Sequence, residues 1–235
     1  MKIAVIGTGT VGRTFASRLS GLGHDVVIGT RSVEGTLIRT QESRAGMPPF
    51  NVWQREHPEV ALAPFAEAGA HGEVIISATA GVATLSALEA VGRDNLAGKV
   101  LVDIALPLDG APGQARSLVV ANNDSLGEQI QRAFPDARVV KTLNTVFVTV
   151  MVDPARLPGH HNVFVSGDDA EAKRTVATLL GEFGWRPESI LDLGGISTAR
   201  AVEMYSSLFF TLAGVMDTFE FNIAIVRSEA NAAVL

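Results

Sequence analysis

The feature that most constrains the fold is a glycine-rich segment between a strand pattern and a helix pattern. The segment is Gly7-Thr8-Gly9-Thr10-Val11-Gly12. Before it, Lys2-Ile3-Ala4-Val5-Ile6 is an apolar run typical of a buried parallel strand, and after it apolar residues recur at helical spacing as far as Gly21. A G-x-G-x-x-G segment in this context is a dinucleotide-binding fingerprint. Its glycines permit a tight turn, close approach of the pyrophosphate and close packing of the helix. The alternative is an ordinary glycine-rich turn.

The end of the second expected strand indicates which dinucleotide binds. Asp25-Val26-Val27-Ile28 is followed by Gly29-Thr30-Arg31-Ser32. NAD-binding domains usually carry an acidic residue there, which would repel a 2′-phosphate. A guanidinium pairs with a phosphate and hydroxyls donate to it, so we predict NADP bound through Thr30, Arg31 and Ser32. The alternative is a solvated Arg31, with Thr30 and Ser32 capping the next helix.

The remaining pattern predicts an α/β fold of the Rossmann type, with a doubly wound parallel sheet. Apolar strand patterns lie at residues 73–78, 99–104 and 138–142, and helical patterns lie near 58–70, 80–92 and 125–134. Ligands bind such sheets beyond the carboxyl ends of the strands. The rule selects Ala78-Thr79-Ala80, Ile104-Ala105-Leu106-Pro107 and Leu143-Asn144-Thr145.

Two longer stretches have no regular pattern. One is residues 46–57, and the other is residues 106–124, which contain Gly110, Pro112 and Gly113. Long loops in compact domains tend to be functional. The second stretch follows a strand end, so we expect it at the rim of the site; a surface excursion is the alternative.

We divide the chain into an NADP-binding Rossmann domain, residues 1–150, and a small C-terminal α/β domain, residues 151–235. In the second unit, strands at 162–166 and 189–193 flank a helix from Asp168 to Gly184, and Ser197 is expected to cap a long apolar helix. This helix carries two apolar stripes: Ala201, Met204, Leu208, Leu212, Val215 and Phe219; and Tyr205, Phe209, Ala213 and Met216. A helix apolar on two faces is buried on both. We therefore expect a homodimer through this C-terminal helix, with a core helix in a monomer as the alternative.

Composition excludes several classes of function. The net charge of −6 argues against nucleic acid as the main partner. The absence of cysteine rules out disulfides, thiolate metal sites and a cysteine nucleophile. No apolar run is long enough for a membrane span, and the chain opens on a strand, so we expect neither a membrane partner nor a signal peptide. The expected location is cytoplasmic.

No residue pattern indicates proton-transfer or metal chemistry. His160-His161 has no metal-ligand spacing and is expected in a surface loop. Tyr205 and Lys141 do not form a Tyr-x-x-x-Lys pair, and we interpret them as helix packing and a strand-end charge. Asp103 is a candidate base, although a turn cap is the favoured reading. Hydride transfer between planar rings needs alignment and water exclusion more than a strong acid or base. We name no catalytic side chain and no metal.

Several motifs resemble one family along nearly the whole chain. They are Gly7-Thr8-Gly9, Gly29-Thr30-Arg31-Ser32, Val139-Val140-Lys141-Thr142-Leu143-Asn144-Thr145, Val165-Ser166-Gly167-Asp168-Asp169 and Asp192-Leu193-Gly194-Gly195-Ile196-Ser197-Thr198-Ala199-Arg200. This order resembles the NADPH-dependent reductases of the 8-hydroxy-5-deazaflavin coenzyme (coenzyme F-420), also called coenzyme F-420:NADP oxidoreductases. The motifs after residue 138 are more specific than the glycine fingerprint.

The resemblance implies an enzyme that moves a hydride between NADP(H) and coenzyme F-420, a small-molecule co-substrate. Family members bind NADP on the Rossmann domain and stack the deazaflavin on the nicotinamide, in a cleft closed by the small domain. The implied roles run along the chain as follows: Thr8 and Thr10 hold the pyrophosphate, Thr30, Arg31 and Ser32 hold the 2′-phosphate, Ala78-Thr79-Ala80 border the nicotinamide, and Asn144 and Thr145 face the deazaflavin.

Two positions depart from the family pattern. Archaeal members carry a lysine at about the place of Gly35 and a histidine in place of Asn144. Related branches, including the cytosolic domains of membrane metalloreductases, have asparagine there and reduce flavin. Two alternatives therefore stay open: an NADPH-dependent reductase of flavin or of a small carbonyl or imine substrate, and a non-catalytic NADP-binding protein.

Overall fold

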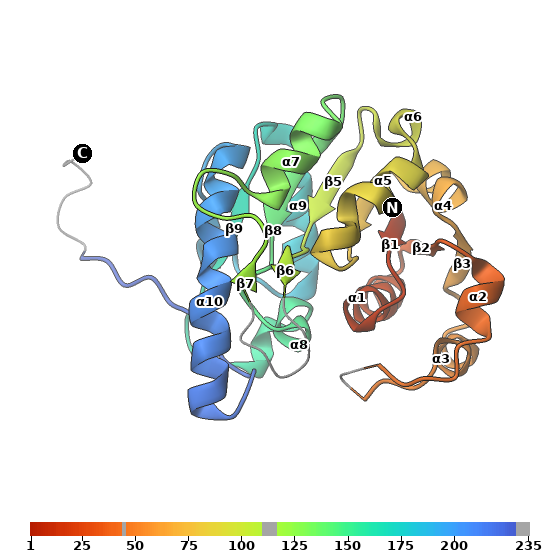
Figure 1. Ribbon diagram of the computed structural model, residues 1–235. Helices are drawn as coiled ribbons and strands as arrows, with labels where there is room; N and C mark the ends of the chain where they lie inside the picture. The colour runs from red at the N-terminus through yellow and green to blue at the C-terminus, as the bar shows by residue number, and fades with distance from the viewer. Residues whose placement is uncertain (44–45, 110–116, 229–235) are drawn as a thin grey trace.

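The computed structural model describes residues 1–43, 46–109 and 117–228 (Figure 1). Eight strands form one sheet in the order β10-β9-β8-β5-β4-β1-β2-β3. Their bounds are β1 Lys2–Ile6, β2 Asp25–Thr30, β3 Ala61–Pro64, β4 Val74–Ser77, β5 Val100–Asp103, β8 Arg138–Thr142, β9 Val163–Ser166 and β10 Ile190–Asp192. All neighbouring pairs are parallel except β8 and β9, which are antiparallel. A short antiparallel pair, β6 Leu108–Asp109 and β7 Ser117–Leu118, stands apart from it.

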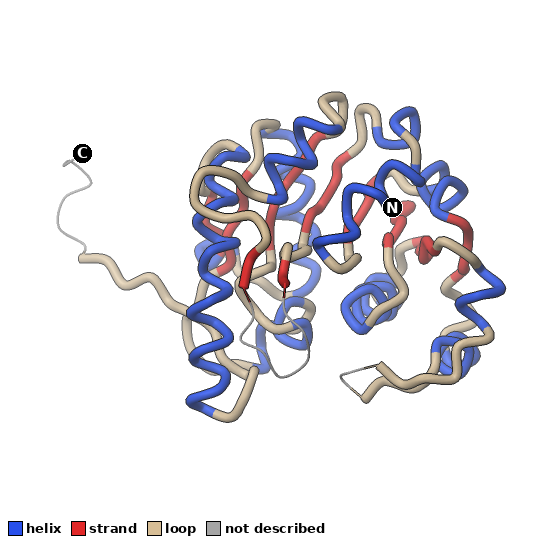
Figure 2. The backbone as a smooth tube through the Cα atoms, in the orientation of Figure 1, coloured by secondary structure: helices blue, strands red, loops and turns tan. Residues whose placement is uncertain are grey.

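Helices cover both faces of the sheet, as a doubly wound fold requires (Figure 2). One face packs against α1 Thr10–Gly21, α3 Phe50–Glu56, α8 Val148–Met151 and α9 Ala170–Phe183. The other packs against α4 Phe65–His71, α5 Thr84–Val91, α6 Arg93–Leu96, α7 Leu126–Ala133 and α10 Ala199–Met216. A five-residue helix, α2 Val33–Leu37, follows β2. The predicted fold is confirmed.

The central strands are continuous apolar runs because both of their faces are buried. In β1 only Lys2 is exposed, and Ile3 to Ile6 are buried. Removing one such side chain from water contributes roughly 1.5–3 kcal/mol. The parallel pairing places the carboxyl ends of β1, β2, β4, β5 and β8 at one edge of the sheet. The candidate segments follow these ends.

Local details of three predictions were wrong. The helical pattern near 58–70 contains strand β3 before α4, and the stretch 46–57 contains helix α3, which buries Phe50 and Trp53. Ser197 does not cap the long helix, because it lies in a 3-10 turn, Ile196–Thr198, that runs into α10. Gly110, Pro112 and Gly113 lie outside the described residues.

The C-terminal part of the chain continues the same sheet. Strands β9 and β10, with α9 between them, extend it beyond β8, and the reversal of direction occurs between β8 and β9. The division of the chain at residue 150 stays a prediction. Within the described residues, no helix combines the length and hydropathy needed to cross a membrane.

Candidate functional site

Gly7 brings three of the predicted segments together. Its backbone N–H donates to the carbonyl of Gly29 at 3.1 Å, and Ala78 N–H donates to the carbonyl of Ile6 at 2.9 Å. The φ angle of Gly7 is +130°, and a Cβ there would lie 2.6 Å from the Ala78 carbonyl oxygen. Only glycine tolerates both conditions. The fingerprint turn therefore packs directly against the ends of β2 and β4.

The N-terminus of α1 is shaped to accept an anion. A Cβ on Gly12 would lie 2.0 Å from the Gly7 carbonyl oxygen, so this glycine lets the helix begin against the turn. Gly9, the N-cap, is exposed and would meet nothing within 4 Å of an added Cβ. No side chain caps the helix, and its first turn has no acidic residue. Unpaired N–H groups and the helix dipole favour a phosphate at such a terminus.

The hydroxyls after β2 are used within the loop itself. Thr30 is buried, and its Oγ1 lies 2.7 Å from Thr36 Oγ1. Ser32 Oγ accepts the Gly35 N–H at 2.9 Å and so caps α2. Arg31 is exposed and pairs with no carboxylate among the described residues. The capping alternative thus describes Ser32, while the roles of these residues toward a 2′-phosphate stay predictions.

Two further arginines stand at the same place, and the sequence analysis missed both. Arg39 Nη2 donates to Thr8 Oγ1 at 3.1 Å and to Thr36 Oγ1 at 2.6 Å. Arg13, on α1, is 4% exposed, and its Nη1 donates to the Pro48 carbonyl. Burial, and then the charge of Arg39, lower the pKa of Arg13. No sequence motif identifies Arg39 as a site residue. It lies beside Thr8 only because of the path that the chain takes through α2.

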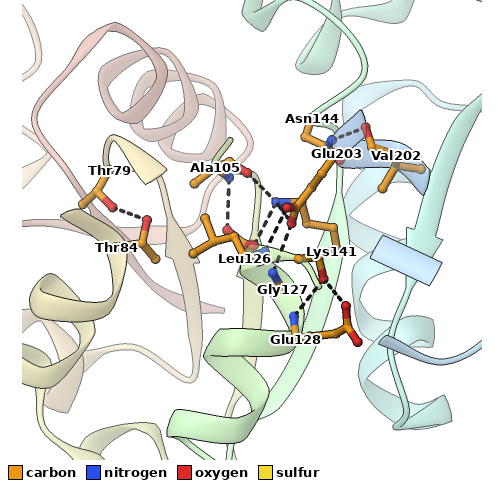
Figure 3. A network of polar contacts seen from close by, with 12 residues as sticks. Thr79, Thr84, Ala105, Leu126, Gly127, Glu128, Lys141, Asn144, Val202 and Glu203 are labelled. Carbon is orange, nitrogen blue, oxygen red and sulfur yellow. Dashed lines mark hydrogen bonds and ion pairs between the residues drawn. The ribbon is translucent and has the colours of Figure 1, made fainter. Parts of the chain in front are cut away.

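The segment after β4 packs against the segment after β5. Thr79 Oγ1 lies 2.9 Å from Thr84 Oγ1, the first residue of α5 (Figure 3). A Cβ on Gly81 would lie 2.2 Å from the Leu106 carbonyl oxygen, so the two backbones are in close contact. The predicted segments Ala78-Thr79-Ala80 and Ile104-Ala105-Leu106-Pro107 thus form one side of the strand-end edge.

The segment after β8 joins this edge to α10. Leu143 has a φ of +62°, an uncommon conformation that turns the chain directly before Asn144. Asn144 is buried, and its Nδ2 donates to the carbonyl of Val202 on α10 at 2.8 Å (Figure 3). Thr145 Oγ1 is buried and has no hydrogen-bond partner among the described residues, and the same holds for Ser77 Oγ at the end of β4. Such orphaned hydroxyls fit a site in which a bound group supplies the partner.

A buried ionic cluster lies beneath the same strand ends. Asp103 on β5 and Lys141 on β8 are paired in register, and Lys141 Nζ lies 2.9 Å from Asp103 Oδ2 and 3.0 Å from Glu203 Oε1 (Figure 3). Lys141 also donates to the Ala105 carbonyl. Lys141 lies one residue before the end of β8, in line with the predicted strand-end charge, but it is fully buried, a setting that the prediction did not include. Asp103 Oδ1 accepts the Ala105 N–H at 3.1 Å, which confirms the turn cap.

Glu203 lies on α10 and connects this cluster to α7. Its carboxylate oxygens accept the N–H groups of Leu126 and Gly127, at 2.8 and 3.1 Å, where α7 begins. Burial raises the pKa of Glu203, and the nearby Asp103 acts in the same direction against the pull of Lys141. Burial alone would lower the pKa of Lys141, but the charges of Asp103 and Glu203 outweigh it, so this pKa is raised. All three ammonium protons have acceptors, so Lys141 serves as a charged clamp with no proton to spare.

The adjacent histidines differ from each other. His160 is exposed, but His161 is 9% exposed and is not in an open surface loop. Its Nε2 lies 3.1 Å from the Pro154 carbonyl oxygen and its Nδ1 lies 2.9 Å from Asn222 Nδ2. In the part of the chain that the structure describes, no three His, Cys, Asp or Glu side chains are grouped to hold a metal ion.

The fold and site define the class of this protein. A dinucleotide turn, an open helix N-terminus and arginines that no described carboxylate neutralises are the features of an NADP-dependent oxidoreductase of the Rossmann type. The sequence profile described as NADP oxidoreductase, coenzyme F-420-dependent, matches residues 2–107. The chain belongs to the coenzyme F-420-dependent NADP oxidoreductase family. NADP and coenzyme F-420 are the coenzymes of that family.

Three relatives show how far the similarity extends. A protein from Arthrobacter sp. FB24, assigned as an F-420-dependent NADP reductase, has a crystal structure that is 53% identical, with a TM-score of 0.91, covering 97% of this chain and 100% of that one. The F-420-dependent NADP reductase of Methanothermobacter marburgensis is 28% identical over 218 residues, 90% of this chain and 92% of its own. The metalloreductase STEAP3 of Rattus norvegicus is 30% identical over 202 residues, 86% of this chain. The match spans only 36% of that longer protein.

Proposed function

We propose that this enzyme transfers a hydride between NADP(H) and coenzyme F-420. The observation that carries the proposal is similarity along both chains to an F-420-dependent NADP reductase, 90% of this one and 92% of the other. The site supports it, because a dinucleotide turn and buried, unpaired hydroxyls lie at one edge of the sheet. We further propose that residues 1–150 bind NADP and that residues 151–235 close the cleft.

The chain's own residues would bind and align the two coenzymes. The amides of Gly7 to Gly12 would hold the pyrophosphate with Thr8 and Thr10, and Arg31 would meet the 2′-phosphate. Ala78-Thr79-Ala80 would border the nicotinamide, and Asn144 and Thr145 would lie on the acceptor side. Bound NADPH supplies the hydride. The anchor from Asn144 to α10 fixes the acceptor side, so that alignment is set before the coenzymes meet.

No side chain in this scheme transfers a proton. Lys141 and Asp103 lie near the strand ends, but each is bound within the buried cluster. The chain would act by holding two rings in register and by excluding water. Reduction of the acceptor also takes up one proton, which solvent would supply after the hydride transfer, so the protein is needed for alignment rather than for acid catalysis.

Flavin is the second candidate acceptor. The resemblance favours it, because it implies histidine in archaeal members where this chain has Asn144, and the chain is 30% identical to a metalloreductase over 36% of that longer protein. The experiment that decides is to mix the purified protein with NADPH and oxidised coenzyme F-420, and to follow the loss of the deazaflavin's visible absorbance. NADH replaces NADPH in one control, and FMN replaces the deazaflavin in another.

Each result of this assay has a definite meaning. Bleaching of the deazaflavin with NADPH, faster than with NADH, supports the proposal. Reduction of FMN without bleaching of the deazaflavin would reject the F-420 assignment in favour of flavin. Tight binding of NADPH with no transfer to either acceptor would indicate another acceptor or a protein that only binds NADP.

We also propose that the protein acts as a cytoplasmic homodimer formed through α10. Along this helix, the first of the two predicted apolar stripes is largely exposed: Met204, Leu208 and Val215 are 38%, 52% and 79% exposed. The other stripe faces the body of the protein through Phe209 and Ala213. A contiguous exposed apolar stripe is typical of an interface.

A further inference from the structure

A chain of side-chain contacts ties the fingerprint turn to the loop after β2. Thr30 Oγ1 lies 2.7 Å from Thr36 Oγ1, and Arg39 Nη2 donates both to Thr36 Oγ1 and to Thr8 Oγ1, at 2.6 and 3.1 Å. Arg39 therefore lies between the pyrophosphate turn and the end of the second strand. In a Rossmann domain, the ribose hydroxyls of the adenosine half are bound at the end of that strand.

Within the part of the chain that the structure describes, no carboxylate pairs with the arginines at this place. These arginines are Arg39, Arg31 and Arg13. Arg13 is buried, and its Nε has no hydrogen-bond partner. Burial, and then the positive charge of Arg39, lower the pKa of Arg13. Arginines gathered at the fingerprint turn, without a paired carboxylate among the described residues, suit a site that binds an anion.

The hydroxyls that the sequence offered for this anion are engaged elsewhere. Ser32 Oγ accepts the Gly35 N–H, and Thr30 Oγ1 is buried against Thr36. Arg39 has donors left, because only its Nη2 takes part in the contacts with Thr8 and Thr36. A guanidinium has five N–H groups, so the N–H groups of Nε and Nη1 are still available to donate to phosphate oxygens.

We propose that Arg39 determines the preference for NADP over NAD, by pairing with the 2′-phosphate together with Arg31. The inference rests on the proposed NADP site and adds a residue to it. Gly35, in α2, has no side chain to reach a phosphate, and Arg39, two residues beyond the end of that helix, supplies the second cation instead. Thr8 and Thr36 hold its guanidinium in place, which reduces the entropy lost on binding.

The test measures the dissociation constants of NADPH and NADH separately, by the fluorescence of the bound dinucleotide. Arg39→Gln keeps a polar side chain and removes the charge, and Arg39→Lys restores the charge. Arg55→Gln, on the exposed side of α3, is the matched control. A hydrogen bond to a charged group is worth roughly 1.5–3 kcal/mol, which is about a 10- to 100-fold change in affinity.

We expect Arg39→Gln to weaken the binding of NADPH by about 10- to 100-fold and to leave the dissociation constant of NADH within about twofold of the wild-type value. Arg39→Lys should regain part of the NADPH affinity, and Arg55→Gln should change neither. Equal weakening of NADPH and NADH would overturn the inference, because Arg39 would then only support the Thr8 turn. An unchanged NADPH affinity would overturn it as well. If the wild-type protein itself does not prefer NADPH to NADH, the proposed NADP site fails instead. The acceptor plays no part in this measurement.

Discussion

At the scale of single residues, the glycines of the fingerprint have separable roles. Gly12 permits the fold, since a Cβ there would overlap the Gly7 carbonyl oxygen at 2.0 Å. Gly9 leaves open space, because an added Cβ would meet nothing within 4 Å. One glycine is required by packing within the protein, and the other by the approach of a bound phosphate. Substituting alanine at each position can separate these roles.

We expect Gly12→Ala to lower the free energy of unfolding by about 1–3 kcal/mol or more, because the methyl group meets backbone that cannot move aside. Gly9→Ala should cost less than about 1 kcal/mol, since φ is −75° and the space is open. Gly9→Ala should still weaken the binding of NADPH by about tenfold or more, because the methyl group would occupy the space through which the pyrophosphate approaches the backbone. Urea denaturation and NADPH titration measure both effects. Wild-type NADPH affinity in Gly9→Ala would contradict the proposed pyrophosphate site.

The residues that sequence reasoning found and missed differ in how local their signal is. The glycine fingerprint is recognised from six consecutive residues, and the structure places Gly7 against Gly29 and Ala78 as a strand-end site requires. Arg39 has no such signal, because its contact with Thr8 spans 31 positions and depends on the path of α2. The setting of Lys141 was equally hidden, since its second carboxylate, Glu203, comes from α10.

At the scale of elements, α10 is fixed to the sheet from two adjacent positions. Glu203 binds Lys141 and the first two N–H groups of α7, and the carbonyl of Val202 accepts the amide of Asn144. Asn144 follows β8 by two residues, so the proposed acceptor side moves with this helix. The contacts of Lys141 with Asp103 and Glu203 position α10, and their contribution to stability can be measured without following the reaction.

Lys141→Met should destabilise the protein by about 3–5 kcal/mol, because it leaves two carboxylates buried without a cation. The pKa of Glu203, which burial already raises, should rise further in the folded variant, because the charge of Lys141 that lowers it is gone. The folded state would bind more protons than the unfolded state, so the stability of the variant should fall as the pH rises from about 5 to 8. Denaturant unfolding at several pH values measures this slope.

Lys173→Met is the matched control, because Lys173 pairs with Asp192, whose side chain is 55% exposed. A pair of this kind is worth about 0–1 kcal/mol. Similar losses in the two variants, or no pH slope in Lys141→Met, would show that the buried cluster does not hold α10 in place.

Element boundaries were harder to predict than the elements themselves. The apolar runs of the central strands have one meaning in a parallel sheet, and the structure confirms β1, β4, β5 and β8 within a residue or so of the expected ranges. Strand β3 was not predicted, because Ala61–Pro64 is only four residues long, contains proline and lies at the edge of the sheet. Helix α3 escaped because it starts after Pro48-Pro49, a signal that reads as a loop.

At the scale of the whole molecule, the periodicity of α10 separates into an inner and an outer stripe. Val202, Phe209 and Ala213 pack inward, while Met204 and Leu208 are exposed on the outer side. After the helix the chain packs back onto the body, where Phe219 stacks on Phe147 and the Ile225 N–H donates to Asn162 Oδ1; beyond these contacts Val226 is 93% exposed. Sequence alone could predict that the helix is apolar on two faces. Only the fold shows which stripe is left uncovered, and the proposed homodimer would cover it.

Light scattering during gel filtration tests this proposal. The wild-type protein should elute with about twice the monomer mass of 24.7 kDa. Met204→Glu combined with Leu208→Glu should give the monomer, because charged side chains in an apolar interface would be buried without partners. Leu22→Glu, at an exposed apolar residue after α1 on the opposite face of the sheet, is the matched control and should stay dimeric. A wild-type monomer, or a dimer that survives the double substitution, would show that this stripe is not the interface.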